Sequence, residues 1–308
     1  MKKKIKQIDV KPDENIKKLI SDMDNTGFGA KRLARACKIY EKMVKTKNCK
    51  KFFALAGAMV PVGMQRVIHD MLDLGFIDVL VTTGANLTHD VVETLGLNHL
   101  QGNIAKIETN DVKLYDERMN RIYDVFMPNQ VYESMEDFII EHLNNNFDKN
   151  MSVKEFLWLL GEKLPNHPHS ILKVCSEKRI PIFCPAFTDS GLAMQVHFSN
   201  NNLNLNHFSD LNEMINYAWD AEIAGVCIVG GGVPKNYIFQ AMQFSPNQAS
   251  FAIQVTMDRP EPGGLSGAEI REAISWGKIN KNAEYSTVIA DATIILPLLL
   301  SYLKTTCL

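Results

Sequence analysis

The sequence has 308 residues, of which 46% are apolar and 22% are charged, and its formal net charge is −2. This length suits one large domain or two small ones, and the near-neutral charge is not the signature of a nucleic-acid-binding protein. The apolar runs are too short to span a bilayer, and no apolar secretory segment follows the first lysines. We therefore expect a cytoplasmic protein that binds neither nucleic acid nor membranes.

In chain order, residues 1–30 are predicted to form an N-terminal arm, and a helix follows it in the segment "FGAKRLARACKIYEKMVKT". Apolar runs then alternate with helical patterns. The expected strands cover 52–60, 77–84, 180–187, 225–232, 251–256 and 286–293. The patterns after the first two strands predict helices, and Thr88 is expected to cap the second of them. Pro234 is typical of the first turn of another helix, and residues 131–178 predict a helical insertion without strands.

Continuous apolar strands that are each followed by a helix indicate a parallel sheet with both faces covered. We therefore predict an α/β fold with a doubly wound, mostly parallel, Rossmann-like sheet, which forms a single domain over residues 31–308. Six cysteines occur without any C-x-x-C spacing. Several lie in apolar runs, where free thiols behave as small hydrophobic groups, so we expect reduced, buried cysteines.

Small and polar residues follow most of the predicted strands, where an open parallel sheet binds its ligands. Glycines at such places let backbone N–H groups approach a phosphate, although the G-x-G-x-x-G dinucleotide motif is absent. The pattern therefore predicts a nucleotide or phosphate ligand. Asp189 and Asp291 could equally bind ribose hydroxyls or cap the next helix. The residues at the strand ends are 56–58, 82–86, 188–191, 230–232 and 291–293.

The most unusual stretch is 258–279, in which a loop rich in proline and glycine leads to a short helix with Glu272 and Trp276, followed by Gly277 and Lys278. Desolvation beside Trp276 would lower the pKa of Lys278 and make its neutral amine a nucleophile. The indole could also hold a cationic amine, which Glu272 could neutralise. The residues alone leave open a second interpretation, in which Lys278 is an ordinary surface lysine.

Other candidate residues have a weaker basis. His167 and His169 share a loop without a third metal ligand nearby. His89 and His197 fit polar edge positions better than a general base. Ser190 lacks the G-x-S-x-G setting of a hydrolase nucleophile. None of these residues supports a metal site or a hydrolase.

The segment "SGAEIREAISWGKI" resembles the active-site segment of deoxyhypusine synthases, in which the lysine after Trp-Gly forms a covalent intermediate. Further similar segments are "DVLVTTGAN", "IPIFCPAFTDSGL", "CIVGGGVPKNYI" and "VIADATIILPLL", and the resemblance covers about residues 25–303. It implies a homotetramer that binds NAD at the strand ends. Carried over by position, the NAD contacts would be Gly57, Ala58, Met59, Val60, Pro61, Thr83, Gly84, Ala85, Asp189, Met257, Asp291 and Ala292.

The resemblance also implies a substrate and a reaction. Lys278 would be the catalytic residue, and the amine pocket would contain Gly231, Glu272, Trp276, Asn236 and Asp258. NAD would oxidise spermidine, Lys278 would take up the butylamine group as an imine, and an acceptor amine would then displace Lys278. The acceptor could be a lysine of a translation factor, giving deoxyhypusine, or putrescine, giving homospermidine.

Several positions depart from the family pattern. Asn236 replaces a histidine, Met194 and Leu265 replace acids, and Thr88-His89 replaces a pair of glutamates. In the family, the lost carboxylates would hold a polyamine cation. Asp258 and Glu261 could partly take the place of these carboxylates. These changes are similar to those of a deoxyhypusine synthase-like subgroup in bacteria and some archaea, and they favour a small-amine acceptor.

Two alternatives differ in class from this transferase. A non-catalytic or regulatory NAD-binding homologue would have lost the amine site, which the missing acids favour and the intact Glu272, Trp276 and Lys278 disfavour. An NAD-consuming deacylase would share only a related sheet, and the chain lacks the zinc-binding cysteine pairs of that class.

Overall fold

The computed structural model describes residues 4–102, 110–143, 150–199 and 203–308. None of the helices in these ranges is long and apolar enough to cross a membrane. The chain divides into two compact units. The first unit contains Met1–Ala56, Met71–Thr82 and Phe208–Leu308, and the second contains Gly57–Asp70 and Thr83–His207.

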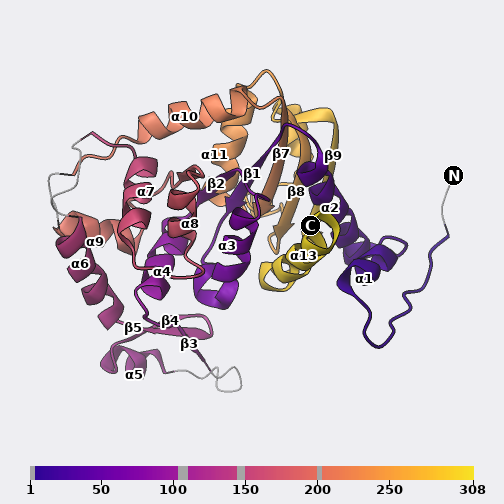
Figure 1. The fold of residues 1–308 in the computed structure, drawn as a ribbon. Helices are drawn as coiled ribbons and strands as arrows, with labels where there is room; N and C mark the ends of the chain where they lie inside the picture. Colours follow the sequence, from indigo (N-terminus) through magenta and orange to yellow (C-terminus); the bar gives the residue numbers. More distant parts are fainter. Residues whose placement is uncertain (1–3, 103–109, 144–149, 200–202) are drawn as a thin grey trace. The chain divides into compact units, whose positions relative to one another are not determined.

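Parallel strands form the centre of the first unit (Figure 1). Their order is β2 (Val79–Thr82), β1 (Cys49–Leu55), β7 (Ile223–Val229), β8 (Ala249–Thr256) and β9 (Ile279–Ile289). Each neighbouring pair is parallel. β2 and the last four residues of β1 are buried throughout, as expected for strands with both faces covered. The predicted α/β class and parallel sheet are confirmed.

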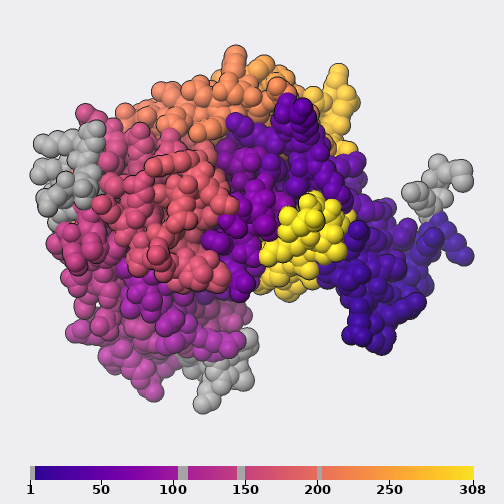
Figure 2. Space-filling model, in the orientation of Figure 1, coloured from indigo at the N-terminus to yellow at the C-terminus, as the bar shows by residue number. Residues whose placement is uncertain are grey.

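The helices of the first unit begin with α1 (Ile16–Met23) and α2 (Phe28–Lys45). The hydroxyl of Ser286 on β9 donates to the carbonyl of Arg32 on α2 at 2.9 Å, so the start of α2 lies beside the carboxyl-terminal half of β9. The C-terminal helix α13 (Ala292–Cys307) packs against α1 and α2, and its yellow atoms adjoin the indigo N-terminal residues in Figure 2. The remaining helices are α10 (His207–Trp219), α11 (Gly232–Gln243) and α12 (Glu272–Ser275).

The second unit is mainly helical. The described part of the predicted insertion, residues 131–178, contains most of α6 (Gln130–His142), α7 (Val153–Lys163) and α8 (Ile171–Glu177), without a strand. The unit also contains a helical turn η1 (Val60–Met64), α4 (Gly84–Thr94), α5 (Asp111–Asp116), the short strand β6 (Ile182–Phe183) and α9 (Gly191–Ser199), while α3 (Gln65–Asp73) crosses the boundary between the units.

The second unit also contains a small antiparallel sheet that the sequence pattern did not predict. Its strands lie in the order β3 (Leu100–Gln101), β5 (Val125–Pro128) and β4 (Met119–Ile122). They have two to four residues each and contain few fully buried side chains. Strands this short do not produce a recognisable hydrophobic period, which is why the pattern did not predict them.

A buried carboxylate connects three segments of the second unit. Asp90 on α4 is fully buried and accepts hydrogen bonds from Gln65 Nε2 at 2.7 Å and from Ser170 Oγ at 3.0 Å. It also accepts from the backbone nitrogens of Ile171 and Leu172 at 2.8 and 2.9 Å. Burial raises the pKa of Asp90, and these four donors oppose that effect. Asp90 therefore positions α4 against the start of α8.

Candidate active site

Lys278 lies between α12 and β9 in the first unit. Gly277 precedes it with φ +67°, a conformation that favours glycine, and the Lys278 backbone nitrogen donates to the Ala273 carbonyl at 2.9 Å. The side-chain nitrogen lies 5.2 Å from the centre of the Trp276 ring. Desolvation lowers the pKa of Lys278. The indole is 62% exposed, so a second cation can reach it.

The turn after β7 packs against the loop that leads to α12. A Cβ atom at Gly231 would overlap the backbone of Ser266, so only glycine allows this approach. Gln254 Nε2 donates to the carbonyls of Gly230 and Ser266, both at 2.9 Å. The hydroxyl of Thr256 also donates to the Ser266 carbonyl at 3.1 Å. These bonds fix the loop against the carboxyl ends of β7 and β8.

Lys235 on α11 is a buried lysine that the sequence analysis did not single out. Only 5% of its surface is exposed, and its ammonium donates to the carbonyls of Leu265 and Ala268 and to Gln254 Oε1. The feature of the sequence that could have drawn attention to Lys235 is its place in "GGGVPKNY", three residues after the third glycine. The sequence pattern alone could not show that this lysine is buried.

The other residues of the first unit that were predicted to bind NAD or the amine differ in their exposure and hydrogen bonds. Asp258 accepts a hydrogen bond from the Ser266 hydroxyl, while Met257 is 67% exposed. Asp291 caps α13 by accepting from Thr293 N at 2.8 Å, which is one of the two roles left open for it. Glu272 begins α12 and is exposed, Ala292 begins α13, and Asn236 follows Lys235 on α11.

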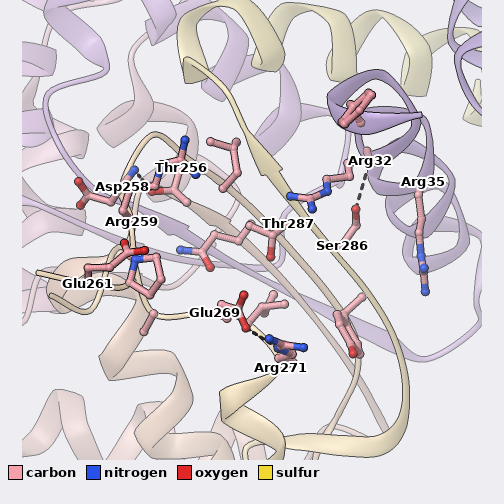
Figure 3. Close-up of a pocket in the computed structure, with 18 of the residues that line it drawn as sticks. Arg32, Arg35, Thr256, Asp258, Arg259, Glu261, Glu269, Arg271, Ser286 and Thr287 are labelled. Carbon is pink, nitrogen blue, oxygen red and sulfur yellow. Dashed lines mark hydrogen bonds and ion pairs between the residues drawn. The ribbon is translucent and has the colours of Figure 1, made fainter. Parts of the chain in front are cut away.

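A cavity of about 770 Å³ lies within the first unit, between the start of α2, the 256–271 loop and the end of β9. Figure 3 shows Arg32 extending from α2 towards the strands, with Asp258 and Arg259 on the loop. Arg271 is paired with Glu269, whereas Arg32 forms no ion pair with any residue that the structure describes. Thr256 and Thr287 add hydroxyl groups to the lining. The cavity therefore offers both cationic and hydroxyl groups beside Asp258.

The predicted cofactor loops of the second unit contact one another. Asn86 Oδ1 accepts from the backbone nitrogens of Met59 and Val60 at 2.7 and 3.2 Å. The hydroxyl of Thr83 donates to the Gly57 carbonyl at 2.7 Å. The segment 57–61, which includes Ala58 and Pro61, is thereby held next to 83–86, which includes Ala85.

The loop that carries Asp189 packs against the start of α4. A Cβ atom at Gly84 would overlap Ser190, and Thr88 Oγ1 accepts from Leu192 N at 3.0 Å. Asp189 is exposed beside this contact. Within the second unit the fold therefore brings all three predicted cofactor segments together.

One sequence prediction at this place was wrong. α4 begins at Gly84, and its cap is Thr83, which accepts from the backbone nitrogen of Asn86. Thr88 lies inside the helix and donates to the Gly84 carbonyl at 2.9 Å. Threonine can fill either position, and the hydrophobic period did not locate the first turn.

His89 lies on α4 in a chain of hydrogen-bonded groups. Its Nδ1 atom is 2.8 Å from His99 Nε2, and His99 Nδ1 contacts the Glu93 carboxylate. Burial, assisted by His99 and opposed by Glu93, lowers the pKa of His89 to about 4. His89 is therefore neutral at pH 7 and does not supply the negative charge of the glutamate that the family pattern places there.

The surroundings of the remaining candidate residues do not indicate catalysis or metal binding. The hydroxyl of Ser190 donates to the Phe187 carbonyl at 2.7 Å and accepts from Ala193 N. The rings of His167 and His169 are 5.9 Å apart, and no group of three His, Cys, Asp or Glu side chains among the described residues is arranged to hold a metal. Met194 and Leu265 are 47% and 45% exposed, so both present apolar groups to solvent.

Comparisons with known proteins agree along almost the whole chain. The family model described as "Deoxyhypusine synthase" matches residues 18–303. A Methanosarcina mazei protein named "Probable deoxyhypusine synthase 1" is 43% identical over 303 residues, which cover 98% of this chain and 94% of the relative. An Archaeoglobus fulgidus protein of the same name is 41% identical over 295 residues, with 95% of each chain covered.

The structure is similar to that of a "putative deoxyhypusine synthase" from Entamoeba histolytica. The TM-score is 0.67 at 19% identity, and the match covers 97% of this chain and 96% of the other. At this identity the likeness concerns the fold, and it agrees with the parallel α/β sheet.

Proposed function

Because the chain belongs to the deoxyhypusine synthase family, a family of transferases, we propose that it transfers the butylamine group of spermidine through an imine on Lys278. The observation that carries this proposal is the position of Lys278. Its amine faces the Trp276 ring at 5.2 Å, and desolvation lowers its pKa. The lowered pKa increases the fraction of neutral amine, which is the form that attacks a carbon centre.

The proposed cofactor is NAD, which would accept a hydride from the carbon beside the secondary amine of spermidine and later return it. Each unit, taken by itself, offers groups that suit a part of a dinucleotide. In the first unit, Arg32 and Thr256 offer a cation and a hydroxyl in the cavity beside Asp258. In the second, the joined 57–61 and 83–86 loops present backbone groups at a helix start.

The proposed amine site consists of Lys278, Trp276, Glu272, Gly231, Asp258 and Asn236. The exposed indole of Trp276 would hold the cationic end of the polyamine, and the Glu272 carboxylate would neutralise it. Lys278 would form a C–N bond to the oxidised carbon as diaminopropane leaves. The acceptor amine would then displace Lys278, which regains its free amine.

The acceptor is proposed to be a small amine such as putrescine, giving homospermidine, rather than a protein lysine. Three features support this choice. Met194 and Leu265 are apolar where the family pattern has acids, and His89 is neutral at pH 7. Compared with the family pattern, the chain has therefore lost negative charges at three positions.

The test uses labelled spermidine, NAD and either putrescine or a translation-factor acceptor, followed by borohydride trapping. We expect a labelled adduct on Lys278 and labelled homospermidine. Labelled acceptor protein in place of homospermidine would overturn the small-amine choice. An absence of any adduct with every polyamine tested would overturn the function itself.

The quaternary structure is proposed to be a homotetramer, in line with the family resemblance. Phe28 at the start of α2 is 97% exposed and is available to a partner surface. Native mass spectrometry measures the assembly directly, and a monomer at micromolar concentration would contradict the proposal.

A second candidate is a non-catalytic NAD-binding homologue, which the apolar Met194 and Leu265 favour. Lys278→Ala distinguishes the two. If the variant binds NAD and retains every activity of the parent protein, the non-catalytic function is correct.

A further inference from the structure

Lys235 and Lys278 both lie in the first unit, but only Lys235 is enclosed. Its nitrogen is 2.7 Å from the Ala268 carbonyl, 2.9 Å from the Leu265 carbonyl and 3.2 Å from Gln254 Oε1. An ammonium group has three hydrogens to donate, whereas a neutral amine has two. The three acceptors therefore match the charged form of Lys235.

Two other charged groups act on this ammonium. Burial is the largest influence and lowers the pKa of Lys235 to about 8, Glu272 raises it, and Lys278 lowers it. At pH 7 the ammonium form still predominates. None of its three hydrogen-bond acceptors is a carboxylate, so its charge is not neutralised by direct contact.

The bonds of Lys235 also hold the segment that leads to the reactive lysine. Leu265 and Ala268 flank Ser266, which packs against Gly231, and α12 starts four residues after Ala268. Gln254 joins the same network through its bonds to Gly230 and Ser266. Removing Lys235 therefore leaves this segment without its central donor.

We propose that Lys235 is a positioning residue for Lys278, whose buried ammonium holds the 265–268 segment and thereby keeps Lys278 in its place after α12, beside Trp276. Release of this segment would expose the Lys278 amine to water and raise its pKa. The inference rests on the proposed function only in taking Lys278 as the nucleophile.

The test measures the protonation of Lys278 without polyamine or NAD. The full chain and Lys235→Met are labelled with acetic anhydride across the pH range in which lysines titrate, and Lys278 acetylation is followed by peptide mass spectrometry. In the variant, labelling at pH 7 should slow by about tenfold, and half-maximal labelling should move to higher pH. Lys281→Met removes an exposed lysine from β9 and should leave the profile unchanged.

Two further results test the positioning role. Lys235→Arg keeps a cation that can donate to the carbonyls of Leu265 and Ala268, and it should retain the parent profile. If Lys235→Met lowers the melting temperature while Lys278 labels with the parent pH profile, Lys235 is only structural and the proposal is wrong. The proposal is equally wrong if carbon-13 NMR of the parent protein shows neutral Lys235 at pH 7, a measurement that does not depend on the variant folding.

This test is separate from that of the function. A parent protein that forms no adduct with spermidine and NAD refutes the transferase, whereas the acetylation profile of Lys278 still reports whether Lys235 controls its protonation.

Discussion

The side-chain oxygen of Asn86 lies 2.7 Å from the backbone nitrogen of Met59 and accepts its hydrogen bond. Together with the bond from Thr83 to Gly57, this contact joins two of the loops that we propose for NAD binding. The same oxygen also accepts from Val60 N at 3.2 Å. We expect Asn86→Ala to weaken NAD binding by about tenfold and to cost about 1–3 kcal/mol of unfolding free energy, because two backbone donors, one buried and one part-buried, lose their acceptor. Calorimetry and denaturant unfolding measure the two effects. Asn98→Ala, at an exposed position, is the control, and NAD affinity equal to the parent's in Asn86→Ala would contradict the proposed role.

Removal of Arg32 tests whether the cavity holds a phosphate. Arg32→Ala should raise the NAD dissociation constant by about fivefold at low salt, with a smaller effect at high salt because ions screen the exposed cation. Titrations at two ionic strengths measure this. Lys163→Ala removes an exposed cation from α7 that is not one of the lining residues, and it should change nothing. Equal affinities for the parent and Arg32→Ala at low salt would place the phosphates elsewhere.

Gly231 has no space for a side chain. Gly231→Ala should cost about 1–3 kcal/mol, because its Cβ atom overlaps the backbone of Ser266. It should also reduce borohydride trapping at Lys278, since the displaced loop leads to α12. Gly264→Ala is the matched control, because nothing lies within 4 Å of a Cβ atom there. If both variants unfold at the same denaturant concentration, the packing of Ser266 on Gly231 is not required.

Loss of Asp90 should destabilise the second unit. Asp90→Ala leaves four donors without their acceptor, and we expect a loss of about 3 kcal/mol. Urea unfolding followed by circular dichroism measures it. Asp137→Ala on α6, where the carboxylate is exposed, should stay within about 0.5 kcal/mol of the parent. A similar small change in Asp90→Ala would show that the network contributes little.

His89 should make stability depend on pH. Its pKa is lowered to about 4 by burial, whereas an unfolded histidine titrates near about 6.5. Between these values the unfolded chain binds more protons, so the free energy of unfolding falls as the pH drops through this window. The loss is about 3 kcal/mol at most. His89→Gln should flatten the curve, while His197→Gln, at an exposed position, should not. A parent protein with constant stability over this range would contradict the expectation.

The sequence by itself determined the α/β class, the alternation of strands with helices, and the residues that follow the strand ends. These features are local, because a run of apolar residues and a glycine turn are visible within a few positions. The Trp276-Gly277-Lys278 segment and its family were also recognisable from the sequence alone. The short strands β3, β4 and β5 were not, since two to four residues are too few to establish a period.

Only the tertiary structure decided which polar groups are enclosed and which groups they contact. Lys235 and Lys278 both follow glycines within three residues in the sequence, but the fold surrounds only Lys235 with acceptors from distant segments. Likewise, Thr83 rather than Thr88 caps α4, and Asn86 reaches a loop 27 residues earlier in the chain. Burial and hydrogen bonding at these sites depend on residues far apart in sequence, and a local pattern contains no information about such contacts.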